Sequence, residues 1–235
     1  MGRKIGACLV CGGDLKYLDK AELMACHICH TEHMSNIRCE DGHFICDDCH
    51  IARGIDFIVD SCLSTKSRNP IIIAKTIMSF PYIYIHGPEH HVLVGASLLA
   101  AYANSGGEIN LEEAMVDMVE RGKQVPFGVC GLHGCCGAAV STGIFFSIIT
   151  DCNPLKEVEW QNANTMTATA LKTIACHGGP RCCKRESFLA IEAAVEFTKD
   201  LLGVEMKLPK HIVCDFFDQN FECTREKCKF YPNDE

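Results

Sequence analysis

Residues 128–150 read GVCGLHGCCGAAVSTGIFFSIIT, and the rest of the chain is organised around this stretch. Glycine recurs at every third position from Gly128 to Gly137, with cysteines placed between these glycines. Glycine at this density is typical of a backbone that turns tightly and exposes its N–H groups. The apolar run that follows predicts a buried helix over 137–149. Cys136 would then stand at the helix N-terminus, where free N–H donors and the helix dipole stabilise a thiolate or an anionic metal cluster. The stretch therefore predicts a metal centre.

The composition indicates a globular metalloprotein. The chain has 235 residues, of which 48% are hydrophobic and 18 are cysteine. Its apolar stretches are shorter than the roughly 18–20 residues that a membrane span needs, and no signal-peptide pattern opens it. We therefore expect a cytoplasmic protein, in which abundant cysteine is more typical of metal ligands than of disulfides. The net charge of −8 disfavours nucleic acid as a partner.

The first fifty residues predict a separate, zinc-ribbon-like module, which we call the head. Two C-x2-C pairs each present two thiolates from one tight turn, and residues 38–50, RCEDGHFICDDCH, supply a further set of thiols and imidazoles. We expect two zinc ions. The two sites are either consecutive along the chain or interleaved in a cross-brace, and we favour the consecutive arrangement. The predicted metal ligands are Cys8, Cys11, Cys26, Cys29, Cys39, His43, Cys46 and Cys49.

So short a module has little core of its own, so metal binding would supply much of its folding energy. Closed sites with only protein ligands are structural by default. Acidic residues outnumber basic ones in the head, which favours a structural role or docking of a protein partner over RNA binding.

From residue 51 onward, apolar periodicity predicts a mainly α-helical fold, with a cysteine-rich helical domain over 51–235 and a short strand at 82–85. Proline in a first turn and glycine after a last turn mark several of the helix ends. The predicted helices span 51–66, 70–79, 88–103, 111–124, 137–149, 162–175 and 180–202.

Residues 86–91, HGPEHH, contain the order H-x-x-E-H of inverted zinc peptidases. A Gly-Pro pair breaks the first turn, so His86 would not project from the helix together with His90. We expect instead that Glu89 or one of the later histidines reaches a cofactor or substrate at the helix N-terminus. Helix capping and surface polarity are the alternative.

Two cysteine blocks, CGLHGCC at 130–136 and CHGGPRCC at 176–183, share one plan and each leads into a predicted helix. Facing each other, they would line a pocket with thiolates and N–H donors, which suits an iron–sulfur cluster. Side chains of neighbouring residues diverge, so one cysteine of each CC pair would be a ligand and the other would pack in the core or react. The candidate cluster ligands are Cys130, Cys135, Cys136, Cys176, Cys182 and Cys183.

Basic residues flank the second block, where they would lower thiol pKa values and pair with an anionic substrate. A solvated, charged start of a helix is the alternative. The tail has the spacing C-x8-C-x4-C. Its thiols would either close over the central pocket or form a site of their own with one outside ligand. The candidate catalytic residues are His86, Glu89, His90, His133, Arg181 and Arg185, and the candidate metal ligands of the tail are Cys214, Cys223 and Cys228.

The blocks HGPEHH, CGLHGCCGAAVSTGIF and GGPRCCKRES, with the C-terminal C-x8-C-x4-C, resemble the domain-of-unknown-function family 5714 of archaea and anaerobic bacteria. The resemblance covers about residues 55–230 and implies that the blocks belong together; it implies no activity. We expect an iron–sulfur enzyme that performs redox or sulfur-transfer chemistry on a small anionic substrate or sulfur donor. The alternatives are an adaptor that relays metal or persulfide to a partner protein, and an RNA-modifying factor.

Overall fold

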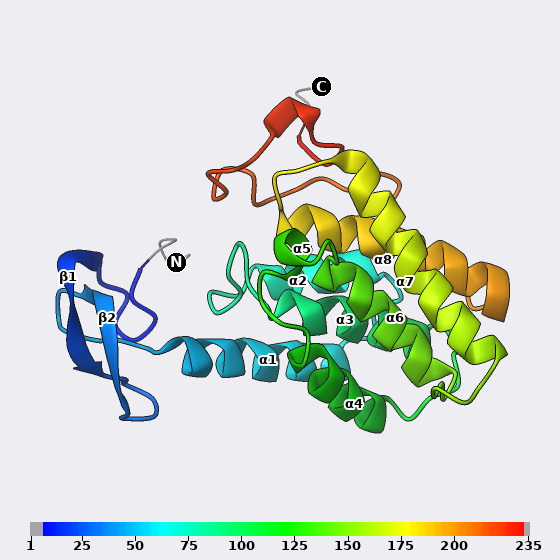
Figure 1. Ribbon diagram of the computed structural model, residues 1–235, viewed down its shortest axis with the longest axis horizontal. Coiled ribbons are helices and arrows are strands. Elements are labelled where there is room, and N and C mark those ends of the chain that lie inside the picture. The colour runs from blue at the N-terminus through cyan, green and yellow to red at the C-terminus, as the bar shows by residue number, and fades with distance from the viewer. Residues whose placement is uncertain (1–6, 233–235) are drawn as a thin grey trace.

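The chain forms a helical domain with a small β-hairpin head (Figure 1), as a computed structural model that describes residues 7–232 shows. Residues 1–6 and 233–235, at the outer ends of the two predicted domains, lie outside the described part. The mainly α-helical fold predicted from the sequence is confirmed. The elements are β1 (Leu15–Ala25), β2 (Glu32–Cys39), α1 (Asp47–Ser64), α2 (Pro70–Met78), α3 (His90–Asn104), α4 (Leu111–Lys123), α5 (Val129–Leu132), α6 (Gly137–Ile149), α7 (Val158–His177), α8 (Cys183–Leu202) and the 3₁₀ helix η1 (Arg225–Lys227).

The head is an antiparallel hairpin that α1 connects to the helical domain. Strands β1 and β2 pair from Leu15 opposite Cys39 to Ala25 opposite Glu32. Helix α1 begins at Asp47, whereas the sequence predicted a start at residue 51. The prediction missed the first turn because that turn is polar and carries no apolar periodicity. A continuous helix therefore leads from the last cysteines of the head into the helical domain, as Figure 1 shows.

Helix α3 lies at the centre of the helical domain, where it packs against α1, α2, α4, α6 and α8. Every residue from His90 to Tyr102 is buried, as expected for a helix that is apolar on most sides. Gly95 allows close packing: its N–H donates to the Ser141 hydroxyl of α6 at 2.9 Å, and a side chain there would collide with Met118. Helix α6 in turn packs against α7 and α8.

The strand predicted at 82–85 is wrong, because this segment forms turns. Its backbone groups bind side chains in place of a second strand: the Tyr84 N–H donates to Glu89, and the Tyr84 carbonyl accepts from Lys184. Helix α6 matches its predicted range, with Cys136 at the N-cap. Helix α8 starts later than predicted, with Cys182 at its N-cap.

No helix within residues 7–232 combines the length and the apolarity that crossing a bilayer requires.

The N-cap of α2 offers a test of local stability. The side-chain oxygen of Asn69, a buried residue, accepts from the N–H groups of Ile71 and Ile72 at 3.0 and 3.1 Å. We expect Asn69→Ala to lower the free energy of unfolding by about 1–2 kcal/mol in urea titrations. Asn110 is the matched control, because it is exposed and caps α4 through one 3.4 Å bond. Equal losses in Asn69→Ala and Asn110→Ala would contradict the prediction.

Candidate metal centres and the polar network between them

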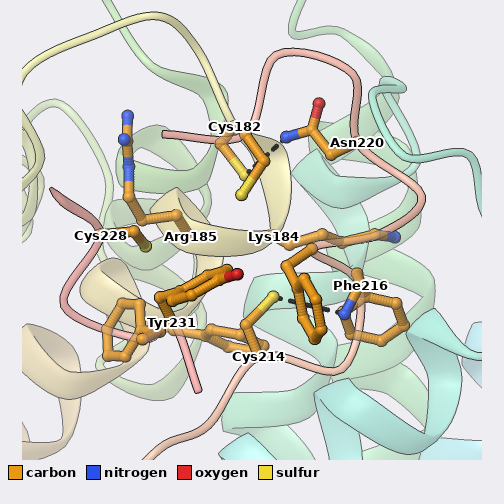
Figure 2. A pocket seen from close by; sticks show the side chains of 12 residues that line it. Cys182, Lys184, Arg185, Cys214, Phe216, Asn220, Cys228 and Tyr231 are labelled. Atoms are coloured by element: carbon orange, nitrogen blue, oxygen red, sulfur yellow. Dashed lines mark hydrogen bonds between the residues drawn. The ribbon is translucent and has the colours of Figure 1, made fainter. Parts of the chain in front are cut away.

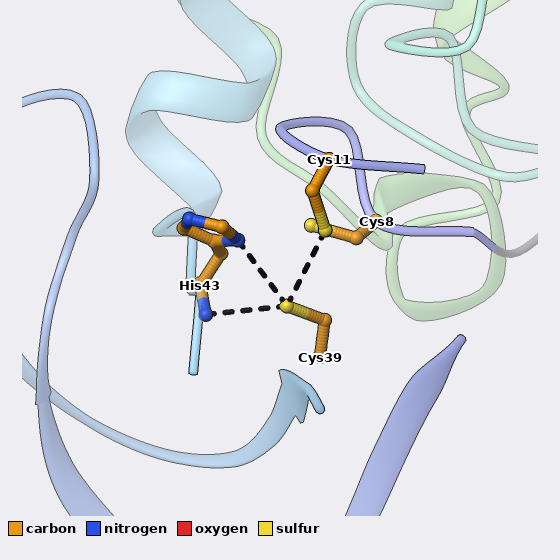
Figure 3. Close-up of side chains that lie close together, drawn as sticks. All are labelled: Cys8, Cys11, Cys39 and His43. Carbon is orange, nitrogen blue, oxygen red and sulfur yellow. Dashed lines mark hydrogen bonds between the residues drawn. The ribbon is translucent and has the colours of Figure 1, made fainter. Parts of the chain in front are cut away.

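The first metal-binding group of the head consists of Cys8, Cys11, Cys39 and His43 (Figure 3), whose ligand atoms all lie within 4.8 Å of one another. The Sγ atoms of Cys11 and Cys39 are 3.8 Å apart, and Cys39 Sγ is 3.4 Å from His43 Nδ1. A tetrahedral ion with metal–sulfur bonds of about 2.3 Å places two sulfurs about 3.8 Å apart. The four side chains are therefore spaced for one tetrahedral ion.

The second group consists of Cys26, Cys29, Cys46 and Cys49, which meet the same distance criterion. The Sγ atoms of Cys29 and Cys46 are 3.8 Å apart. Backbone N–H groups of Ile28 and Cys46 donate to Cys26 Sγ at 3.4 and 3.3 Å. Such N–H···S bonds stabilise the thiolate form that binds a metal. The head therefore contains two preformed metal-binding groups.

The two groups are interleaved, so the consecutive pairing favoured from the sequence is wrong. Because Leu15 pairs with Cys39, the hairpin brings the end of β2 back beside the first C-x2-C pair. The chain then returns to the hairpin turn, where the Phe44 carbonyl accepts from the His27 N–H at 2.7 Å. The connectivity is therefore a cross-brace: the pair Cys8/Cys11 shares a group with Cys39/His43, and the pair Cys26/Cys29 shares a group with Cys46/Cys49.

Pairs of substitutions test this connectivity, with bound metal ions per chain as the readout. Cys8→Ser with Cys39→Ser removes two candidate ligands from one group, so the double variant should keep one of two metal ions. Cys8→Ser with Cys26→Ser damages both groups, so both ions should be lost. Consecutive pairing predicts the reverse pattern.

In the helical domain, the segment 86–91 and the start of α8 are held together by Lys184. Its buried ammonium donates to the Tyr84 carbonyl at 2.8 Å and to His90 Nε2 at 3.1 Å. His90 Nδ1 donates to the Gly87 carbonyl at 3.0 Å. Burial lowers the pKa of Lys184 to about 8 and lowers the pKa of His90 well below its usual value. His90 is therefore a neutral imidazole with both ring nitrogens in hydrogen bonds.

Two further candidate residues of the segment are buried or half-buried beside this network. Glu89 Oε1 accepts from the Tyr84 N–H at 2.7 Å, while its Oε2 is buried without a hydrogen-bond partner among the described residues. Burial raises the pKa of Glu89. His86 Nε2 lies 3.2 Å from Asn220 Oδ1, and the Asn220 amide donates to Cys182 Sγ at 3.6 Å. His86 is thus linked to the start of α8 through the tail.

Arg185 and Glu186 form a buried ion pair that braces the glycine loop before α8. The guanidinium of Arg185 donates to Glu186 Oε1 at 2.8 Å and to the carbonyls of Gly178 and Pro180 at 2.7 and 2.9 Å. Both carboxylate oxygens of Glu186 accept from the Cys182 N–H. The Arg185 N–H groups that make these bonds already have acceptors within the protein and are not free to bind a substrate. Arg181, by contrast, is exposed.

Breaking this pair should destabilise the fold. Arg185→Met leaves Glu186 buried without its cation, so we expect the free energy of unfolding to fall by about 3–5 kcal/mol. Arg181→Met is the matched control, with an expected loss below about 0.5 kcal/mol. Urea unfolding of both variants checks this. An unchanged stability of Arg185→Met would show that the guanidinium does not brace the loop.

The six candidate cluster ligands do not form one group. Cys183 lies within electrostatic range of Cys136 and of its neighbour Cys182, and Cys136 lies within range of Cys130. Of these thiols, Cys182 also lines a pocket under the tail. Cys176 is exposed and Cys135 half-buried. Their roles as ligands stay predictions, as does the role of the exposed His133.

The pocket under the tail, drawn in Figure 2, lies between the start of α8 and the tail and is partly open to solvent. Four thiols from α8 and the tail line it, together with aromatic rings. Lys184 and Asn220 also line the pocket; nothing in the sequence marks Asn220, because its contacts form only when the tail folds over α8. The four thiols are those of Cys182, Cys214, Cys223 and Cys228.

Comparison with known proteins identifies one family. The family of unknown function DUF5714 matches residues 58–231, which include the last turns of α1, all later helices and most of the tail. No curated protein and no solved structure matches the chain. The matched range contains the three sequence blocks and the tail cysteines but leaves out the head. The resemblance seen in the sequence is thereby confirmed, and the chain belongs to the family of unknown function DUF5714.

Proposed function

We propose that the chain is an iron–sulfur protein that performs redox or sulfur-transfer chemistry in its helical domain. The observation that carries the proposal is the pocket in which thiols from α8 and the tail surround a common space. Among residues 7–232, the groups whose ligand atoms all lie within 4.8 Å of one another are the two in the head. An iron–sulfur cluster is held by up to four thiolates, and four thiols line this pocket.

In this proposal the two groups of the head bind zinc. Zinc takes four cysteine or histidine ligands in closed structural sites. One group of the head offers three thiols and an imidazole and the other offers four thiols, so both meet that requirement. Zinc does not change its oxidation state, so the redox chemistry belongs to the helical domain. The zinc ions would fix the hairpin, which is also the surface we propose for contact with a protein partner.

A second candidate function is a relay of metal or persulfide to a partner protein. Cys176 is exposed, and Cys130 and Cys135 lie half-buried beside the exposed apolar side chains of Phe127 and Leu132. Accessible thiols next to an apolar surface favour transfer between proteins. This candidate predicts that Cys176→Ser abolishes transfer of labelled sulfane sulfur to an acceptor thiol, with the metal content unchanged.

Metal analysis of the full chain after anaerobic purification tests the leading proposal. We expect two zinc ions and about four iron and four sulfide per chain, a brown colour, and an EPR signal that appears on reduction with dithionite. A colourless protein that contains zinc alone, including a third zinc ion, would contradict the proposal.

A further inference from the structure

We infer that the pocket under the tail is a closed [4Fe–4S] site whose four ligands are Cys182, Cys214, Cys223 and Cys228. The inference rests on the proposed function, and it replaces the set drawn from the two CC blocks. It also assigns Cys183 to a second environment outside the cluster.

The four thiols come from two parts of the chain that meet only in the folded protein. Cys182 is the N-cap of α8, where N–H groups at the helix start face an anionic cluster. The tail supplies the other three, and it is closed on itself because the Cys214 N–H donates to the Phe230 carbonyl at 2.7 Å. The tail thus completes a ligand set that α8 begins, and Cys182 is the outside ligand that the three tail cysteines require.

N–H···S hydrogen bonds reach three of the four sulfurs. The Phe216 N–H donates to Cys214 Sγ and the Arg225 N–H to Cys223 Sγ, both at 3.4 Å. The side-chain amide of Asn220 donates to Cys182 Sγ at 3.6 Å. Donors of this kind stabilise thiolates and set the potential of iron–sulfur clusters.

Aromatic side chains wall the pocket. Phe188 and Phe230 are fully buried, with ring centroids 5.4 Å apart in an edge-to-face contact. Phe217 and Tyr231 form a second such pair at 5.1 Å. An apolar wall lowers the local dielectric, which affects the reduction potential of a cluster.

Positive charge stands beside the pocket. A [4Fe–4S] cluster with four thiolate ligands carries a net negative charge, which is costly to bury without a cation nearby. The Lys184 ammonium lies 5.0 Å from the centroid of the Phe216 ring, and the Lys184 side chain lines the pocket (Figure 2). The site therefore provides counter-charge for an anionic cofactor.

Cys182 and Cys183 lie in different surroundings, although they are neighbours in the sequence. Cys182 lines the pocket. Cys183 lies near the Gly87 N–H and within electrostatic range of Cys136, on the side of α6. One cysteine of this pair is therefore a ligand, and the other belongs to a second group of thiols.

A fully ligated cluster favours one of the two proposed chemistries. With a protein thiolate on each of the four irons, no iron is left to bind substrate or sulfide. The cluster then accepts one electron from an external one-electron donor, passing from the 2+ to the 1+ state, and returns it to an acceptor. This assigns one-electron transfer to the site.

Serine variants of the full chain, prepared without oxygen, test the ligand set. Cys214→Ser and Cys228→Ser should lower iron from about four per chain to below about one, or change the EPR signal of the reduced protein. Cys183→Ser and Cys136→Ser should keep the iron and the signal. Cys152→Ser is the matched control, because Cys152 is also half-buried but lies outside the pocket. Two zinc ions per chain and an unchanged circular dichroism spectrum show that a variant is folded.

A measurement on the unsubstituted protein does not depend on how the variants fold. Alkylation with iodoacetamide, mapped by mass spectrometry before and after oxidative removal of iron with ferricyanide and reduction of the apoprotein with a phosphine, should show four newly reactive cysteines. The expected residues are Cys182, Cys214, Cys223 and Cys228.

The outcomes separate the inference from the proposed function. If iron is present but is lost from Cys136→Ser and Cys183→Ser, or if those two thiols become reactive instead, the ligand set is overturned and the protein is still an iron–sulfur protein. If the unsubstituted protein contains no iron, the proposed function fails, and the inference fails with it.

Discussion

The buried ammonium of Lys184 ties together segments that lie far apart in the sequence. It donates to the Tyr84 carbonyl and to His90, and it stands over the ring of Phe216 in the tail. A buried ammonium is costly without acceptors, so these acceptors must stay in place. Their positions fix the turn at 82–85, the start of α3 and the tail relative to α8. The geometry of the pocket depends on this arrangement.

The start of α8 is the second constraint. Glu186 accepts from the Cys182 N–H and is neutralised by Arg185, which in turn holds the loop carbonyls. The backbone at Cys182 is thereby anchored from both sides. Because adjacent side chains diverge at this helix start, Cys182 meets the tail while Cys183 meets α6. The start of α8 thus places Cys182 beside the tail cysteines and Cys183 near Cys136.

The head depends on a different kind of interaction. Its hairpin leaves large apolar side chains exposed, among them Tyr17, Leu23 and Met34, so it has little apolar core to stabilise it. Metal ligation supplies folding free energy to modules of this size. The head contacts the helical domain through α1, where the ring of His50 stacks on the ring of Tyr84 with 3.8 Å between the ring centroids. The same Tyr84 binds Lys184 through its carbonyl, so the head and the pocket share a neighbour.

The sequence by itself determined the features that depend on residues close together in the chain, namely the helices and the ligand pairs of the head. Apolar periodicity indicated the helices, because burial of one face repeats along the chain, and C-x2-C and C-x3-H spacing indicated the candidate ligands of the head, because one turn presents both ligand side chains. The tertiary structure alone decided which distant groups meet. The hairpin register placed Cys39 beside the first C-x2-C pair, and the fold of the tail placed Cys214 beside Cys182. Local spacing does not encode such meetings, because they depend on how packed helices and a returning chain bring remote residues together.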